Sequence, residues 1–394
     1  MSGLSRRSLF YGGAAIAASA GLKSSLVWSA DAAKAATAPG AKEEIFLGAN
    51  EYPDGPGEAA RRAVAAIIPK GGRYLDSLTV DLVKLFASKL GVAPDHVTAY
   101  AGSFMPLNWT SLAFTSPTAG LVAADPTFTV GVRRAQLIGT PLHLSPLRSD
   151  YTHDTEALTR EAHEKKAGLL YICNPNNPTG TVTSRADIEA VIRNKPKDTV
   201  VVVDEAYIDF TDERSVVDLV ASGADVVVLR SFSKIHGLAG LRLGFAIARP
   251  DLLARLNRFG HSPLPVTAVT AGIASLEDTA LVPTRKAATA RSRADLVAWL
   301  KNKGYTTSPS DASFFLIDVK RPGNDFVTAF KSRGIHVGRV WQPYATAFRV
   351  TLGTPAELAV FKQAFTSIEQ ELKSVPVQSA HVIGDDHSEW GHVC

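Results

Sequence analysis

The hydrophobic pattern of the chain alternates, from Glu43 onward, between short apolar runs and longer amphipathic stretches. The apolar runs are bounded by Gly, Pro or Asp, which is typical of parallel strands covered on both faces. Between them lie helical patterns; Ser184 and Asp187 form an N-cap pair that opens a helix reaching Ile192. Strands that alternate with helices predict an α/β fold with a mostly parallel, doubly wound sheet. The runs predicted as strands are Val97–Tyr100, Leu121–Ala124, Leu169–Ile172, Val200–Val203, Val226–Leu229 and Leu243–Ile247.

The C-terminal part of the chain has a different pattern, which predicts a smaller α+β domain. A helical pattern covers about 283–303, and the apolar run Phe314–Val319 predicts a strand after it. Thr-Pro-Ala-Glu at 354–357 is a capping box with proline at the first helical position. It opens a final helix that reaches about Leu372.

These patterns divide the chain into five parts. They are an export segment (1–38), an N-terminal segment that joins the small domain (39–75), a large domain (76–282), a small C-terminal domain (283–374) and a polar tail (375–394). The tail contains histidines and Cys394, but they do not recur at a ligand spacing, so we expect no metal site there.

The first segment has the pattern of an export signal. Arg6 and Arg7 precede an apolar stretch at Leu9–Leu22, and small residues continue to Ala38. The adjacent arginines resemble a twin-arginine signal, so we expect export to the periplasm or outside the cell. The apolar stretch is shorter than the roughly 20 residues that a membrane-spanning helix needs, so we expect no stable membrane span.

Composition narrows the possible partners. Of 394 residues, 45% are hydrophobic and 20% are charged, which fits a soluble globular protein. The formal net charge is +4, and most of it lies in residues 1–35, which hold four basic residues and one acidic residue. Because the remainder is nearly neutral and has no basic cluster, we expect no nucleic-acid partner. Two cysteines, Cys173 and Cys394, give no disulfide framework.

Three motifs follow predicted strands. The loop from Asn174 to Gly180, with two prolines and three asparagines, comes directly after one strand. A plain strand-to-helix connection is the simplest reading, but in open α/β sheets ligands bind beyond the carboxyl ends of strands. The next strand ends at Asp204, whose buried carboxylate needs a cation partner. Tyr207 follows three residues later and could donate to a phenolate oxygen.

The third strand leads into a segment that can hold a phosphate. Ser231, Ser233 and Arg242 supply two hydroxyls and a guanidinium among small residues. Lys234 lies among them. A single lysine is ordinarily a solvated surface charge, but a lysine beside cationic groups can have a lowered pKa and act as a nucleophile.

In this chain order, the three motifs resemble those of fold-type I pyridoxal-phosphate (PLP) aminotransferases, and most of all the histidinol-phosphate aminotransferase branch. The resemblance covers roughly Ile45 to Glu369. It implies that PLP is the cofactor and that an amino group moves between an amino acid and a 2-oxo acid. It also implies a large PLP-binding domain, a small C-terminal domain and a homodimer with shared active sites.

The resemblance assigns roles to individual residues. Lys234 would be the Schiff-base lysine and proton shuttle, and Asp204 would pair with the pyridine nitrogen. Asn177 and Tyr207 would bond the ring oxygen O3′. The residues expected at the cofactor phosphate or ring are Gly102, Ser103, Phe104, Ser231, Ser233 and Arg242, with Phe128 stacked on the ring and Tyr74 reaching the partner subunit's phosphate.

Substrate binding is expected at the C-terminal domain. Arg349 would grip the α-carboxylate, a task suited to the guanidinium fork, and Asn50 lies in the family's entry motif. Arg339 resembles the arginine that binds the substrate phosphate in the family, yet it stands one residue later than the usual spacing. The phosphate turn continues into Phe104 and Met105 where the family usually has acidic residues.

These departures favour an aromatic or other hydrophobic substrate, with Trp341 and Tyr344 as contacts. Histidinol-phosphate aminotransferase proper is the alternative. A PLP-dependent decarboxylase or lyase on the same scaffold is a further one, because fold alone does not fix chemistry.

Overall fold

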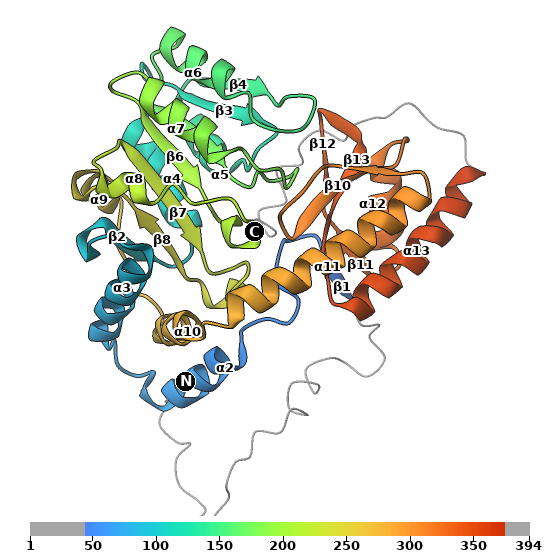
Figure 1. Ribbon diagram of the computed structural model, residues 1–394, viewed down its shortest axis with the longest axis horizontal. Coiled ribbons are helices and arrows are strands. Elements are labelled where there is room, and N and C mark those ends of the chain that lie inside the picture. Colours follow the sequence, from blue (N-terminus) through green and yellow to red (C-terminus); the bar gives the residue numbers. More distant parts are fainter. Residues whose placement is uncertain (1–43, 375–394) are drawn as a thin grey trace, which may run out of the picture. The chain divides into compact units, whose positions relative to one another are not determined.

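A seven-stranded sheet forms the centre of the large domain in the computed structural model, which describes residues 44–374 (Figure 1). Its strand order is β2-β8-β7-β6-β5-β3-β4. β8 runs antiparallel to both of its neighbours, and the remaining pairs are parallel. The strands are β2 (Val97–Tyr100), β3 (Leu121–Asp125), β4 (Leu142–Pro146), β5 (Leu169–Cys173), β6 (Val200–Asp204), β7 (Val226–Ser231) and β8 (Gly244–Ile247). The α/β prediction and its strands are confirmed, and β4 is an additional edge strand.

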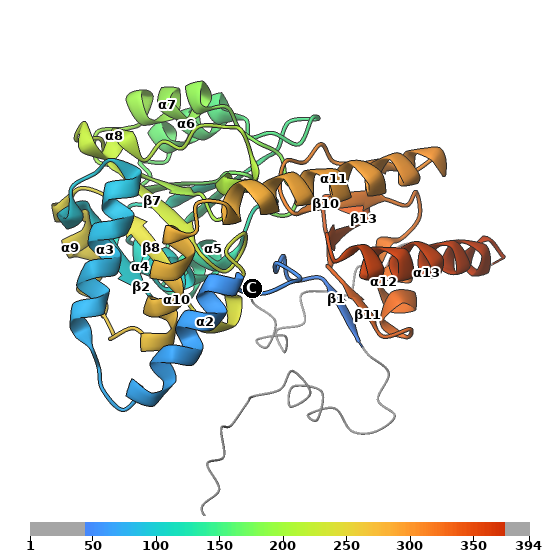
Figure 2. The same cartoon turned by 60° about the horizontal axis from the view of Figure 1, so that its bottom comes forward.

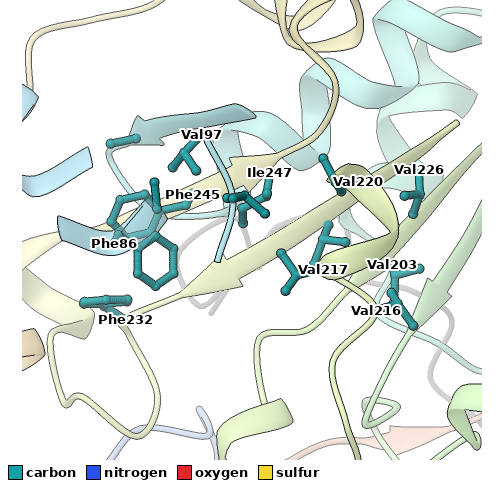
Figure 3. Packing of buried hydrophobic residues seen from close by; sticks show 14 of the residues in the cluster. Phe86, Val97, Val203, Val216, Val217, Val220, Val226, Phe232, Phe245 and Ile247 are labelled. Carbon is teal, nitrogen blue, oxygen red and sulfur yellow. The ribbon is translucent and has the colours of Figure 1, made fainter. Parts of the chain in front are cut away.

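The central strands are apolar on both faces because helices cover both sides of the sheet. In β6, Val201 and Val203 belong to one buried cluster, while Val200 and Val202 belong to a second. Successive side chains of a strand point to opposite faces, so one run of valines serves two cores. Figure 3 shows part of the first cluster, where Phe232 and Phe245 pack with valines of several elements. Each fully buried valine contributes about 1.5–3 kcal/mol.

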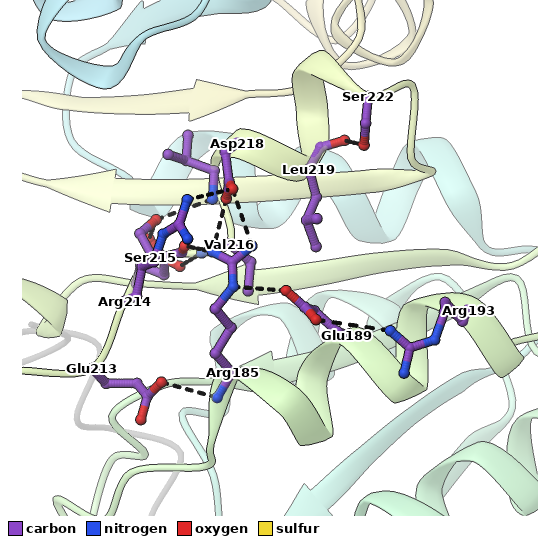
Figure 4. A network of polar contacts seen from close by, with 12 residues as sticks. Arg185, Glu189, Arg193, Glu213, Arg214, Ser215, Val216, Asp218, Leu219 and Ser222 are labelled. Atoms are coloured by element: carbon purple, nitrogen blue, oxygen red, sulfur yellow. Dashed lines mark hydrogen bonds and ion pairs between the residues drawn. The ribbon is translucent and has the colours of Figure 1, made fainter.

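The helices of the large domain connect the strands. They are α3 (Asp76–Leu90), α4 (Phe104–Phe114), α5 (Val130–Leu137), α6 (Thr155–Glu164), α7 (Arg185–Asn194), α8 (Asp218–Ala221), α9 (Pro250–Asn257) and α10 (Val266–Glu277). The predicted cap of α7 is confirmed, since the Ser184 side chain accepts from the Asp187 backbone N–H. Arg185 then bonds Asp218 and Glu189, which ties α7 to α8 (Figure 4).

The small domain contains two sheets. One has the order β12-β13-β10-β9, and the other pairs β1 (Ile45–Leu47) with β11 in parallel. The other elements are β9 (Thr306–Thr307), β10 (Phe314–Asp318), α12 (Gly323–Lys331), β11 (Ile335–Val337), β12 (Val340–Trp341), β13 (Tyr344–Thr351) and α13 (Pro355–Lys373). The capping box at the start of α13 is confirmed, because the side chains of Thr354 and Glu357 bond each other's backbone N–H.

Two segments connect the domains. The long helix α11 (Leu281–Asn302) extends from the large domain to the small one, as both ribbon views show (Figures 1 and 2). Of the segment 39–75, which we expected to join the small domain, the structure describes 44–75; there β1 pairs with β11, and Asn50 bonds Thr351 of β13. α2 (Glu58–Ile67) packs instead on α10 of the large domain, where Ala60 is buried in the same cluster as Ala268 and Val269. No helix in 44–374 is long and apolar enough to cross a bilayer.

Candidate active site

The carboxyl ends of three neighbouring parallel strands bring the predicted site residues together. β5, β6 and β7 lie side by side in the sheet. Asn177 follows β5, Asp204 ends β6, and Lys234 follows β7. Parallel strands all end at the same edge, so three motifs that are far apart in the sequence meet there.

Asp204 is a buried carboxyl whose pKa is raised to about 6. Burial is the main cause, because it disfavours the charged form. The opposing effects are hydrogen bonds from the Tyr171 hydroxyl and the Ala206 N–H, both at 3.2 Å, and the positive charge of Lys234. A cation placed against the carboxylate would favour its charged form, and a protonated pyridine nitrogen is such a cation.

Tyr207 lies at the centre of a set of amide donors. Its hydroxyl oxygen accepts from Asn50 Nδ2 at 3.1 Å and from Asn177 Nδ2 at 3.4 Å. Burial raises the pKa of Tyr207 above its ordinary value, so the phenol stays protonated. Since both amides donate to its oxygen, the O–H proton can be given to another acceptor, such as a phenolate oxygen.

Lys234 lies on the turn after β7 and is buried. Its Nζ donates to the Ala49 carbonyl at 3.3 Å and lies 5.6 Å from the centroid of the Tyr207 ring. The amine that could carry a cofactor therefore lies between the strand-end motifs and the N-terminal segment.

Arg242 and the turn at Gly102 form a cradle for an anion. Arg242 has a left-handed φ of 64°, and its Nη1 bonds the Ala239 carbonyl at 2.9 Å and lies 3.5 Å from Ser233 Oγ. A Cβ at Gly102, whose φ is 87°, would lie 2.3 Å from Arg242 Nη2, so a larger residue there would be strained and would displace the guanidinium. Ser103 is the N-cap residue of α4, whose first N–H groups favour an anion at this helix end.

Arg349, on β13, is only 6% exposed. Its Nη1 donates to Asn177 Oδ1 at 2.6 Å, and its Nη2 donates to the Gly48 carbonyl. Its buried Nε has no hydrogen-bond partner among the described residues. Burial lowers the pKa of Arg349 to about 10, so it remains positive at neutral pH. The guanidinium carbon lies 5.3 Å from the centroid of Trp341.

The structure also places the other residues that the sequence predicted for the site. Phe104 begins α4 and is 37% exposed, and Phe128 packs against the second core cluster of the large domain. Arg339 is exposed, with its guanidinium carbon 4.9 Å from the Trp341 centroid. Tyr74 is 80% exposed. Ser231 ends β7, and its Oγ accepts from the Ser233 N–H at 3.2 Å.

Sequence reasoning missed two contacts of the site. Tyr171, within β5, bonds Asp204, and Thr351 Oγ1 bonds both the backbone N–H and the side-chain Oδ1 of Asn50 at 3.0 Å. Tyr171 lies inside a buried strand, and Thr351, the last residue of β13, is 301 positions away from Asn50 in the sequence. Only the strand register and the pairing of distant segments reveal them.

The donor set fits PLP in three independent respects. Asp204 is a buried acid suited to a cationic ring nitrogen, Tyr207 has an O–H to donate, and Arg242 lies against a glycine turn at a helix start. When bound, the cofactor withdraws electrons from the substrate's α-carbon, which makes its proton acidic. The Lys234 amine could take up and return that proton, while the Arg349 fork could hold the carboxylate. Fold and site together define a PLP-dependent enzyme of fold type I.

Comparison with known proteins gives the family. The model of aminotransferase class I and II matches residues 42–365. Histidinol-phosphate aminotransferase 1 of Cupriavidus pinatubonensis is 35% identical over 340 residues, covering 84% of this chain and 88% of the relative. Aromatic amino acid aminotransferase of Rhodococcus jostii is 32% identical over 347 residues, covering 86% and 94%.

Solved structures agree with the fold. The histidinol-phosphate aminotransferase of Sinorhizobium meliloti, in complex with pyridoxal-5′-phosphate, has a TM-score of 0.78 at 24% identity and covers 83% of this chain and 91% of its own. The chain therefore belongs to the aminotransferase class I and II family, and it is a PLP-dependent aminotransferase.

Proposed function

We propose that this aminotransferase takes the amino group from amino acids with an aromatic or other hydrophobic side chain and passes it to a 2-oxo acid. In this proposal Lys234 carries the cofactor, Asp204 holds its ring nitrogen and Arg349 binds the substrate carboxylate. The substrate class is inferred from the position of Trp341, whose ring centroid lies 5.3 Å from the Arg349 guanidinium carbon. A substrate held by Arg349 would have an indole surface beside it, which suits an apolar side chain.

Relatives named for histidinol phosphate and for aromatic amino acids both match over most of the chain. The arginine expected for a substrate phosphate would stand at position 338, where this chain has glycine. A Cβ at Gly338 would lie 2.9 Å from both the Cβ and the carbonyl oxygen of Arg349. A side chain at 338 would therefore displace Arg349, and this supports the aromatic proposal over histidinol phosphate.

A screen of amino donors against 2-oxo acids tests the proposal. We expect phenylalanine or tyrosine to exceed histidinol phosphate in kcat/KM by at least about tenfold, equivalent to about 1.4 kcal/mol. Histidinol phosphate as the best donor would establish the alternative instead. Release of carbon dioxide without formation of a 2-oxo acid would establish a decarboxylase.

We also propose that two copies of the chain share their active sites. Tyr74 supports this, because it matches the family's tyrosine that reaches the partner subunit's phosphate, and at 80% exposure its side chain is accessible to a partner. In the shared arrangement it would reach the phosphate bound by the partner subunit. Mixing Tyr74→Phe with Lys234→Ala would then yield hybrids with one site that carries neither substitution. Activity that stays at the level of the separate variants would contradict shared sites.

We propose, finally, that the enzyme is exported by the twin-arginine route. The support is the sequence pattern around Arg6 and Arg7, which lies outside the described residues. That route carries folded proteins, which suits an enzyme that binds its cofactor before export.

A further inference from the structure

We propose that Arg285, on α11, is a positioning residue for the transamination reaction. It joins two segments: the lysine turn, residues 234–237, and the strap, residues 48–55. By fixing the distance between them it would place Lys234 and the substrate-binding Arg349 relative to each other. The inference rests on the proposed roles of those two residues.

Arg285 is buried and bonds both segments at once. Its Nη1 donates to the Ile235 carbonyl at 2.8 Å, and its Nη2 donates to the Gly55 carbonyl at 2.7 Å. Its guanidinium carbon lies 4.0 Å from the centroid of the Tyr52 ring, also in the strap. A planar fork with donors in fixed directions can join two carbonyls in this way, whereas an ammonium cannot hold the same geometry.

The strap contacts three groups of the site. The Ala49 carbonyl accepts from Lys234 Nζ, and the Gly48 carbonyl accepts from Arg349 Nη2. The Asn50 side chain donates to the Tyr207 hydroxyl. Consecutive residues of one segment thus touch the cofactor lysine, the carboxylate arginine and the phenol, so a shift of the strap would move all three contacts together.

The inner side of the strap is packed tightly, and its outer side is not. Gly237, with a φ of 70°, lies so close that a Cβ there would be 2.0 Å from the Gly55 carbonyl oxygen. On the outer side, strap residues 51–54 line a cavity of about 470 Å³ bordered by α11 and α13. Thr351 and Arg349 hold the strap near Asn50 and Gly48, so with packing incomplete on the outer side the Gly55 end depends on Arg285 and the lysine turn.

Substitution of Arg285 tests the proposal in the holoenzyme. We expect Arg285→Met to raise KM for the amino acid and lower kcat, so that kcat/KM falls about tenfold or more. We also expect a changed pH midpoint for the absorbance of the bound cofactor, because a shifted strap would move Asn50 away from the Tyr207 hydroxyl that is expected to face the ring oxygen. Arg285→Lys should show a smaller effect in the same direction, since it keeps the charge but not the fork.

Arg185→Met is the matched control, because Arg185 also joins a helix to a loop carbonyl, that of Ser215, but touches no part of the strap. It should lower the unfolding temperature and leave KM and the absorbance midpoint unchanged. If Arg285→Met behaves like this control, Arg285 is only structural and the proposal is wrong. Borohydride labelling of the wild-type protein tests the role of Lys234 separately. Failure of the Arg285 proposal can therefore be distinguished from failure of the Lys234 assignment.

Gly237→Ala provides a second route should Arg285→Met fail to fold. Its Cβ would push the strap away from the lysine turn. Gly223→Ala is its control, because Gly223 also has a positive φ, of 86°, but open space around it. We expect only Gly237→Ala to raise KM, and equal effects of both substitutions on KM would overturn the proposal.

Discussion

The Tyr171 hydroxyl donates a hydrogen bond of 3.2 Å to the Asp204 carboxylate, from the strand next to that of Asp204. Burial keeps the pKa of Asp204 raised to about 6 despite this donor, because the Tyr171 and Ala206 hydrogen bonds and the charge of Lys234 together do not replace the lost hydration. The charged carboxylate therefore destabilises the folded protein until a further cation lies against it. The free energy of unfolding of the cofactor-free protein should therefore depend on pH through the titration of Asp204.

We expect Asp204→Asn to stabilise the cofactor-free protein at neutral pH and above. The carboxyl titrates near 3.8 when unfolded and at about 6 when folded. The folded state thus binds more protons, and stability falls as pH rises through this window. An amide does not titrate, so the asparagine side chain of the variant avoids this loss of unfolding free energy, which approaches about 3 kcal/mol. Urea unfolding of both apoproteins at about pH 4 and about pH 8 measures the difference.

The holoenzyme should respond in the opposite direction. Asparagine leaves the cationic ring nitrogen without its counter-charge, and breaking a buried ion pair costs about 3–5 kcal/mol. We expect cofactor affinity or kcat to fall by about 10²–10³-fold. A variant with unaltered activity, or an apoprotein stability difference that does not grow with pH, would contradict the role of Asp204.

Lys234→Ala should abolish the covalent link between protein and cofactor. Lys234 is the buried lysine at the strand-end site, and its Nζ lies beside Tyr207. After borohydride treatment, mass spectrometry should find the reduced adduct on the peptide containing Lys234 in the wild-type protein and on no peptide of the variant. An adduct of equal yield on another lysine would show that the assignment is wrong.

The sequence predicts most elements that hold the site because their signals are local. The strand-end motifs at Asp204 and Lys234 and the capping box of α13 each lie within a few neighbouring residues. The antiparallel direction of β8 is not predictable in this way. A buried strand has the same apolar run in either direction, and the direction is set by the short connection from Ser231 to Gly244.

Other features depend on segments that are distant in sequence. In the edge strand β4 the apolar Leu144 is exposed and the polar Ser145 is buried, so burial in this strand does not follow its hydrophobic pattern. The bond from Asn50 to Tyr207 joins residues 157 positions apart. Arg285, in the second turn of α11, has the sequence pattern of an ordinary surface arginine. Only the assembled fold brings it to the strap.

Replacing both Arg6 and Arg7 with lysine should retain the protein in the cytoplasm if the twin-arginine route exports it. The substitution keeps the positive charge, so a charge-only signal would be unaffected, while recognition of the arginine pair would be lost. Fractionation of cells that express each form measures the exported share. Unchanged export of the double lysine variant would argue against this route.

Arg349→Ala should weaken substrate binding and leave cofactor binding unchanged. The guanidinium lies in the small domain, and its Nη atoms bond Asn177 and Gly48 rather than the residues of the Arg242 cradle. The Asn177 oxygen at 2.6 Å marks a direction in which a substrate carboxylate oxygen could also bond. Two charge-assisted hydrogen bonds contribute roughly 1.5–3 kcal/mol each when shielded from water.

We therefore expect Arg349→Ala to lower kcat/KM by about 10²-fold or more. Arg349→Lys should recover little of it, because lysine keeps the charge and loses the two-pronged geometry. Cofactor content and absorbance should stay near those of the wild type in both variants, since no phosphate or ring ligand is removed. Loss of the cofactor from Arg349→Ala would place Arg349 in the cofactor site instead. Wild-type kcat/KM for every amino acid tested would mean that the carboxylate is held elsewhere, and would favour a substrate that is an amine without a carboxylate.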